Sequence, residues 1–158
     1  MSTEYERFLS GKLFRFDPVG FTINSKDLNP MLMPFQSDLV RWAIRRGRAA
    51  LWEDCGLGKT IQQIEWAHAI AERERRPVLI VAPLAVTHQT CFEAKKFGRT
   101  ASIAQKQSEI VPGINVTNYE RLDRFTDASQ FSGIVLDESS ILKAMDGKTR
   151  KALTEFAF

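Results

Sequence analysis

A short run near the middle of the chain combines glycines, a lysine and a threonine at the spacing of a phosphate-binding loop. The run is Asp54-Cys55-Gly56-Leu57-Gly58-Lys59-Thr60. Glycines permit positive φ angles and let main-chain amides approach phosphate oxygens, and successive amides at the start of a helix form an anion-binding nest. We expect Lys59 to reach the β- and γ-phosphates of a nucleotide and the Thr60 hydroxyl to ligate Mg²⁺. The run therefore predicts a site for ATP with magnesium.

The residues on either side of this loop favour that interpretation over a glycine-rich turn with a solvated lysine. The general pattern begins with a glycine, whereas Glu53 stands at that position here. The apolar run Ala49-Ala50-Leu51-Trp52 predicts a buried strand ahead of the loop, and the residues behind it predict a helix from about Lys59 to Glu74. A strand, a glycine-rich turn and a helix in that order are typical of nucleotide-binding proteins.

An acidic pair follows another apolar run later in the chain. Ile134-Val135-Leu136 predicts a buried strand that ends in Asp137 and Glu138. In proteins with this type of loop, an acidic residue at the end of a neighbouring strand holds magnesium, so we expect Asp137 to be the second protein ligand. Glu138 would orient or deprotonate the attacking water. An acidic pair in a surface turn is the alternative, and the upstream loop favours the functional interpretation. The predicted catalytic residues are Lys59, Asp137 and Glu138.

Elsewhere, apolar runs of strand length alternate with helical periodicity. A helix is predicted from Phe35 to its end at Gly47, and Val78-Leu79-Ile80-Val81 reads as a strand covered on both faces. Further strands are expected at 101–104 and 114–117, helices at 86–97, 119–125 and 148–156, and an N-terminal hairpin of 12–16 with 21–23. The alternation predicts an α/β fold with a mostly parallel sheet and helices on both faces. Residues 1–30 would form a small extension, and residues 31–158 one lobe.

Composition limits the class of protein. The chain has 158 residues, of which 44% are hydrophobic and 26% charged, as in a soluble globular domain. We expect no membrane span, no secretion signal, and neither a disulfide scaffold nor a zinc site from Cys55 and Cys91. A cytoplasmic, reducing compartment fits best. The net charge of +3 and the isoelectric point of about 9.0 permit nucleic-acid binding, although simple solubility explains them equally well.

Several segments carry a resemblance to a known family. Glu53 to Thr60 resembles motif I of Swi/Snf-type proteins, commonly Asp-Glu-Met-Gly-Leu-Gly-Lys-Thr, which also lacks the first glycine. Met33-Pro34-Phe35-Gln36 resembles the Q-motif, and Asp137-Glu138-Ser139-Ser140 takes the place of an Asp-Glu-Ala-His box. The chain thus resembles the first RecA-like lobe of a superfamily-two helicase or translocase, nearest the Swi/Snf-type and phage-encoded branch. Ser139 and Ser140 depart from the usual box and put its coupling role in doubt.

The resemblance implies roles for residues on both sides of the loop. Gln36 would read the adenine edge, since an amide both donates and accepts, and Phe35 or a nearby aromatic side chain would pack on the base. Nucleotide contacts are then expected from Phe35, Gln36, Asp54, Cys55, Gly56, Leu57, Gly58, Lys59 and Thr60. The segments from Ala82 to Thr87 and from Val116 to Glu120 resemble motifs Ia and Ib, which contact the nucleic-acid backbone in the family. The implied contacts to DNA, with duplex DNA favoured, are Pro83, Leu84, Thr87, Asn118 and Tyr119, and ordinary strand-to-helix turns are the alternative.

The resemblance also implies a partner for this lobe. A second RecA-like lobe, in the same or another chain, would supply an arginine finger, a group that can raise the rate about 10³- to 10⁵-fold. We therefore expect the ATP-binding lobe of an ATP-dependent DNA helicase or translocase, weak or inactive alone. Its location would be the cytoplasm, or the host cytoplasm if the chain is phage-encoded. A P-loop enzyme of another class, such as a kinase or an AAA-type ATPase, and a non-catalytic interaction domain with a degenerate nucleotide site remain the alternatives.

Overall fold

A parallel sheet forms the centre of the molecule. The structure is a computed structural model that describes residues 17–138. The strands are β1 (Val78–Ala82), β2 (Ala101–Ile103), β3 (Ile114–Asn118) and β4 (Gly133–Leu136). Their order is β2-β3-β1-β4, and every pair is parallel. This arrangement confirms the predicted α/β fold, and the carboxyl ends of all four strands meet at one edge of the sheet.

Helices cover one face of the sheet. The α3 helix (Lys59–Glu74) and the α4 helix (Thr87–Lys96) pack there on a cluster that includes Ile64, Val78 and Val116. The opposite face carries Leu79 and Val81. On that side the covering segments among residues 17–138 are 3-10 turns instead of α-helices.

These turns include η4 (Tyr119–Arg124), which was expected as a short helix, and η5 (Ala128–Gln130). The remaining 3-10 turns are η1 (Ser25–Asp27), η2 (Leu84–Val86) and η3 (Gln107–Glu109). The helix expected at 148–156 lies outside the described residues. Across residues 17–138, no helix has the length and apolar character needed to cross a membrane.

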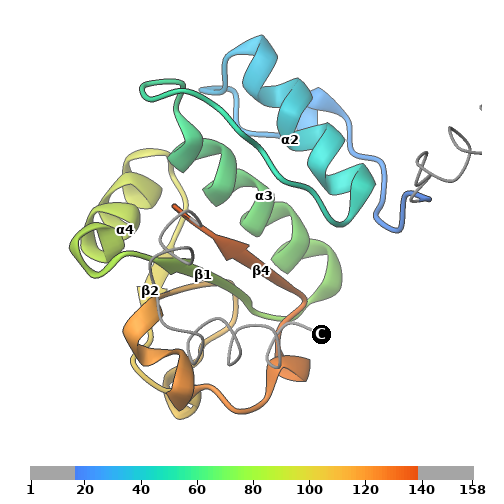
Figure 1. Ribbon diagram of the computed structural model, residues 1–158. Helices are drawn as coiled ribbons and strands as arrows, with labels where there is room; N and C mark the ends of the chain where they lie inside the picture. Colours follow the sequence, from blue (N-terminus) through green and yellow to red (C-terminus); the bar gives the residue numbers. More distant parts are fainter. Residues whose placement is uncertain (1–16, 139–158) are drawn as a thin grey trace, which may run out of the picture.

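The α2 helix (Pro34–Arg46) forms an outer layer on α3, on the side away from the sheet (Figure 1). Its inward face contributes Val40 and Ile44 to a cluster with Leu28 and Ala69. Gly47 ends the helix with a φ of 75°, as its position in the sequence predicted. The α2 helix therefore contacts α3 and has the sheet on the far side of α3.

The described part of the N-terminal segment packs against helices, and the second strand of the predicted hairpin is not formed. Residues 12–16 lie outside the described range, and Phe21-Thr22-Ile23 is not a strand. Phe21 packs against two clusters, and the Arg73 guanidinium lies 4.5 Å from the centre of its ring. The Gly20 amide donates to the carbonyl of Arg45 at 3.2 Å. Phe21 and Ile23 are thus partly buried against α2 and α3, whereas Val19 is 75% exposed.

A buried ion pair joins this segment to the rest of the fold. Glu65 on α3 is 1% exposed and accepts two hydrogen bonds from the Arg99 guanidinium, at 2.8 and 2.9 Å. The main-chain amide of Asn29 donates to the same carboxylate at 2.8 Å. A buried charge is tolerated when it is paired and hydrogen-bonded, as it is here. The cluster therefore fixes the chain before α2 and the chain after α4 to the middle of α3.

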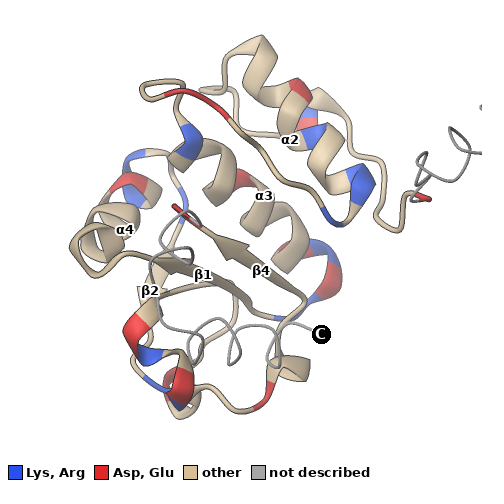
Figure 2. Ribbon diagram, in the orientation of Figure 1, with Lys and Arg blue, Asp and Glu red and all other residues tan. Residues whose placement is uncertain are grey.

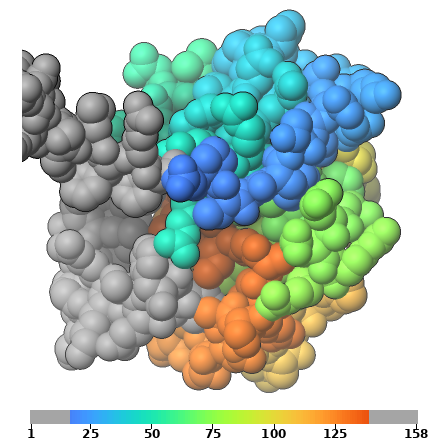
Figure 3. Space-filling view, turned by 90° about the vertical axis from the view of Figure 1, so that its right-hand side faces the viewer, coloured from blue at the N-terminus to red at the C-terminus, as the bar shows by residue number. Residues whose placement is uncertain are grey.

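The run from Ala49 to Trp52 is not the buried strand that its composition predicts. It pairs with no strand, and Trp52 is 93% exposed. This run and the edge strand β4 both line a cavity of about 960 Å³, and Trp66 and Val135 are among its other lining residues. Figure 3 shows the atoms of this run bordering those that lead into β4. An apolar run is buried only where a partner surface is within reach. Here the Trp66 side chain of α3 lies against Gly133 at the start of β4.

Candidate nucleotide-binding site

The glycine loop leads into α3 with its main-chain amides open. Gly56 and Gly58 have φ angles of 84° and 75°, in the left-handed region that favours glycine. A side chain at Gly56 would meet nothing within 4 Å, so the space above the loop is open. Gly58 occupies the N-cap position of α3, and no side chain caps the helix. A helix start with uncapped amides fits a phosphate group.

Lys59 is held inside the loop. Its ammonium group donates to the main-chain oxygens of Glu53 at 3.0 Å and Asp54 at 2.9 Å. These contacts close the loop around the lysine and place its charge beside the open amides. These two bonds use two of the three N–H donors of the ammonium group, so one donor is left for a further acceptor such as a phosphate oxygen.

Gln36 is tied to the same loop from α2. It is 4% exposed, accepts from the Met33 amide at 2.9 Å and donates to the Leu57 carbonyl at 2.8 Å. A side chain at Gly58 would collide with its amide nitrogen unless Gln36 shifted, and the positive φ of Gly58 also favours glycine there. Gln36, which was expected to contact adenine, therefore has both its amide oxygen and its amide nitrogen in hydrogen bonds within the protein. In this conformation it positions the loop. Phe35, the expected stacking residue, is 40% exposed.

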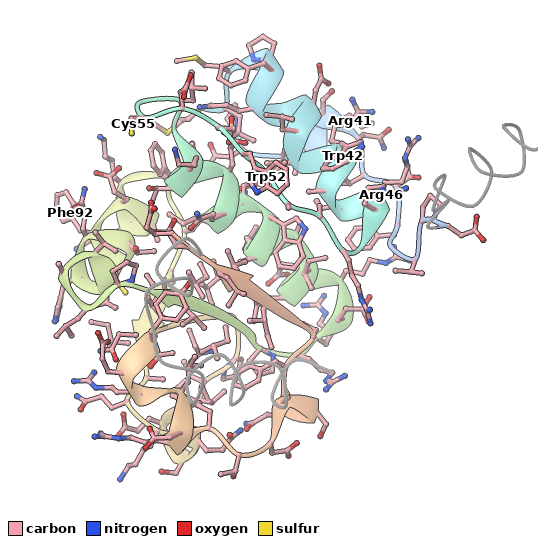
Figure 4. All side chains as sticks on the ribbon, in the orientation of Figure 1. Arg41, Trp42, Arg46, Trp52, Cys55 and Phe92 are labelled. Carbon is pink, nitrogen blue, oxygen red and sulfur yellow. The ribbon has the colours of Figure 1, made fainter. Side chains whose placement is uncertain are left out.

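Glu53, which replaces the first glycine of the general pattern, is anchored to α3. Its carboxylate accepts from Gln62 at 3.1 Å, and the Gln62 amide also lies 3.3 Å from the Leu57 carbonyl. The other carboxylate oxygen of Glu53 and the amide oxygen of Gln62 are buried without a hydrogen-bond partner. One side chain of α3 thus holds the loop before and after its turn. Figure 4 shows Cys55 at that turn, where its thiol is exposed.

The acidic pair lies at the end of β4, within reach of α3. The Asp137 amide donates to the carbonyl of Val81, so Asp137 continues the ladder between β1 and β4. The Gln63 side chain donates to Asp137 Oδ1 at 2.7 Å. Glu138 follows with a φ of 50°, unusual for a residue other than glycine. The structure therefore brings together the loop and the acidic pair that the sequence predicted to form one site (Figure 2).

One residue of this arrangement, Gln63, was not predicted from the sequence, and another, Tyr119, was expected to contact DNA and not Asp137. Gln63 lies one helical turn after Lys59, and Tyr119 donates from its hydroxyl to the main-chain oxygen of Asp137 at 2.7 Å. Burial raises the pKa of the Tyr119 hydroxyl, and the carboxylates of Asp137 and Glu138 raise it further. Spacing along α3 could have suggested that Gln63 faces the site, since residues three and four apart share a helix face.

The oxygen atoms at this place fit magnesium. Thr60 offers a hydroxyl and Asp137 a carboxylate, and Mg²⁺ prefers one or two carboxylates together with phosphate oxygens and waters. Among residues 17–138, no group of three or more His, Cys, Asp or Glu side chains could hold a metal ion by itself. The available set therefore suits an ion that is held jointly by protein and nucleotide.

The residues expected to contact DNA divide into exposed and buried ones. Leu84 is 54% exposed and Pro83 is half-buried at the end of β1. Thr87 is buried, and its hydroxyl donates to the Leu84 carbonyl at 3.0 Å. Asn118 and Tyr119 are each 1% exposed. In this conformation the side chains of these three buried residues cannot contact a nucleic-acid backbone, because they pack beneath the turns that were expected to present them.

The known proteins to which this chain is similar belong to one group. No protein-family model matches the sequence. The chain is 37% identical over 132 residues to the SWI/SNF-related matrix-associated actin-dependent regulator of chromatin subfamily A-like protein 1 of Xenopus tropicalis, covering 77% of this chain and 14% of that protein. It is 30% identical over 143 residues to the DNA annealing helicase and endonuclease ZRANB3 of Mus musculus, covering 80% of this chain and 13% of that protein. The chain thus spans a small part of the length of these relatives.

Solved structures agree with these relatives. The SWI2/SNF2 ATPase core of Sulfolobus solfataricus in complex with double-stranded DNA matches with a TM-score of 0.66 and 25% identity, over 85% of this chain and 32% of that chain. The ATPase core domain from the same organism matches with a TM-score of 0.65 and 28% identity, over 87% of this chain and 33% of that chain.

The parallel sheet, with the glycine loop before α3 and the acidic pair after β4, defines a RecA-like lobe of the superfamily-two class. Within that class the chain belongs to the SWI2/SNF2-type ATPases, since its curated relatives and its structural neighbours come from that group.

Proposed function

We propose that this chain is the ATP-binding first lobe of a SWI2/SNF2-type motor that couples ATP hydrolysis to movement on duplex DNA. The observation that carries the proposal is the hydrogen bond of 2.7 Å between Gln63 of α3 and Asp137 after β4. It places the end of β4 against the first turns of the helix that follows the glycine loop. Nucleotide hydrolysis requires a phosphate site with an acidic pair beside it, and this contact supports that arrangement.

Each group has a defined task in this proposal. The Walker A loop from Asp54 to Thr60 binds the phosphates through its amides and Lys59. Thr60 and Asp137 hold Mg²⁺, which neutralises charge on the phosphates when bound. Glu138 orients the attacking water. Phe35 packs on the base, and Gln36 reads adenine if its amide leaves the carbonyl of Leu57.

The wider assembly is part of the proposal. A second RecA-like lobe closes the other side of the nucleotide and supplies the arginine finger, so this lobe alone hydrolyses ATP slowly or not at all. DNA lies against the loop that contains Pro83 and Leu84, which supplies main-chain amides and an exposed surface. The relative whose structure contains double-stranded DNA supports duplex as the substrate. The location we propose is the cytoplasm, which is that of the host if the chain is phage-encoded.

Calorimetric titration of the chain with ATP and magnesium tests the nucleotide site. Lys59→Ala should weaken binding roughly 10- to 100-fold, because it removes a hydrogen-bonding charge from the phosphates. Lys95→Ala is the matched control, since Lys95 is an exposed lysine on α4 and the same charge is lost. Equal affinity of both variants would remove the phosphate role of Lys59 and favour a non-catalytic interaction domain.

The base specificity is tested by comparing ATP with GTP. Gln36→Ala should weaken both nucleotides alike if the amide acts by holding the loop through Leu57, as its present contacts indicate. A loss confined to ATP would assign the amide to the adenine edge. Stimulation of ATP hydrolysis by duplex DNA in a protein that contains both lobes tests the motor, and hydrolysis insensitive to any nucleic acid would contradict it.

A further inference from the structure

Gln63 occupies the point where α3 meets the acidic pair. It is half-buried on the helix that begins at Lys59, and its amide nitrogen lies 2.7 Å from Asp137 Oδ1. That distance is at the short end for an amide donor and is typical of a bond to a charged acceptor. The bond spans 74 positions of sequence, so it exists only because the fold brings α3 and β4 together.

The main chain of Asp137 is already held at both of its polar groups. Its amide donates to the Val81 carbonyl at 2.8 Å, and its carbonyl accepts from the Tyr119 hydroxyl at 2.7 Å. Rotation of the carboxylate about the side-chain bonds is the freedom that remains. The amide of Gln63 restricts this rotation, since it engages one carboxylate oxygen and leaves lone pairs of the other oxygen unused by this bond.

Thr60 lies on the same side of α3 as Gln63. The two residues are three positions apart, and residues at that spacing are neighbours on a helix surface. One side of the first turns of α3 therefore carries both the hydroxyl that suits magnesium and the amide that orients the carboxylate. A single rigid helix sets the relative position of the two groups.

We propose that Gln63 is a positioning residue that presents the carboxylate of Asp137 to the magnesium ion of a bound nucleotide. It is neither a ligand nor a catalytic residue, because it acts through Asp137. The inference rests on the proposed nucleotide function and deepens it. It predicts that Gln63 matters for the magnesium-dependent part of nucleotide binding and not for the part made by the loop.

The test is a titration of the chain with a fluorescent ATP analogue in excess EDTA and again in saturating magnesium. The ratio of the two affinities measures how much magnesium strengthens binding. Gln63→Leu, which keeps the size of the side chain without its amide, should leave the affinity in EDTA unchanged and lower the ratio roughly tenfold, the worth of a hydrogen bond to a charged group. Gln89→Leu is the control, since Gln89 is an exposed glutamine on α4.

Tyr119→Phe provides a second variant, because it removes the hydrogen bond to the main-chain oxygen of the same Asp137. It should also lower the ratio of the two affinities. The two substitutions should be less than additive when combined, since both act on one residue. Unchanged affinity in EDTA shows that each variant has kept its loop and its fold. A ratio in Gln63→Leu that equals or exceeds that of the unaltered chain overturns the inference and leaves the proposed function standing. Absence of nucleotide binding by the unaltered chain overturns both.

Discussion

The Tyr119 hydroxyl donates a hydrogen bond of 2.7 Å to the main-chain oxygen of Asp137. Tyr119 follows directly on β3, and Asp137 follows directly on β4, so the bond passes across the end of β1 that lies between them. Both residues belong to segments in which the sequence predicted functional roles, on DNA for Tyr119 and on magnesium for Asp137. The structure links these two segments inside the protein.

Tyr119→Phe should lower the free energy of unfolding by about 1–2 kcal/mol, because it removes one buried hydrogen bond and leaves the Asp137 carbonyl without this donor. Urea unfolding of both chains measures the difference. The ring itself stays, so the packing of Tyr119 in its cluster with Leu122 is preserved. No difference in stability would mean that water replaces the hydroxyl at no cost.

The same hydroxyl predicts a loss of stability at alkaline pH. Burial raises the pKa of Tyr119, and so do the charges of Asp137 and Glu138. The folded protein therefore holds this proton more tightly than the unfolded chain, in which tyrosine titrates at about pH 10. The contribution is complete below about pH 10 and is lost as the pH rises further.

Urea unfolding over this range should show that the stability gap between the unaltered chain and Tyr119→Phe narrows as the pH rises. All other titrating groups are common to the two chains, so the difference isolates Tyr119. A gap that is constant with pH would contradict the raised pKa.

Gly58→Ala should destabilise the chain more than Gly56→Ala. Both glycines have positive φ, so alanine costs about 1–2 kcal/mol of backbone strain at either position. At Gly58 the new methyl would also lie 2.4 Å from the Gln36 amide nitrogen, whereas at Gly56 it would meet nothing within 4 Å. The extra loss at Gly58 should disappear in a Gln36→Ala background, since the clash is then absent. Equal losses in the unaltered background would contradict the contact between Gln36 and the loop.

Arg99→Ala should lower the free energy of unfolding by about 3–5 kcal/mol, since it leaves the buried carboxylate of Glu65 without its cation. The arginine side chain is 22% exposed and the glutamate 1%, so solvent screens this pair little. Lys106→Ala is the control, because Lys106 and Glu109 form an exposed pair that contributes about 0–1 kcal/mol. Similar losses for the two variants in thermal or urea unfolding would contradict the prediction that Glu65 depends on Arg99.

Local sequence patterns were sufficient to predict those structural features that depend on neighbouring residues. The glycines before Lys59 need positive φ, and both have it. The apolar run from Val78 to Val81 is the fully buried β1, and the run before Asp137 is β4. The end of α2 at Gly47 follows from the same kind of short-range rule. Strand order was not predicted, because pairing joins segments far apart in the chain.

Tertiary structure decided which side chains face the site. The composition of residues 49–52 predicts burial, yet Trp52 is exposed and the run forms no strand. Thr87, Asn118 and Tyr119 were expected at a surface and are buried, since they fill the space beneath the ends of β1 and β3. The partner of Gln63 lies 74 residues away, at the end of another strand. The sequence by itself determined the glycine loop, because its positive φ angles depend on consecutive residues. Only the fold determined how Asp137 is held, because its partners come from α3, β1 and the turn after β3.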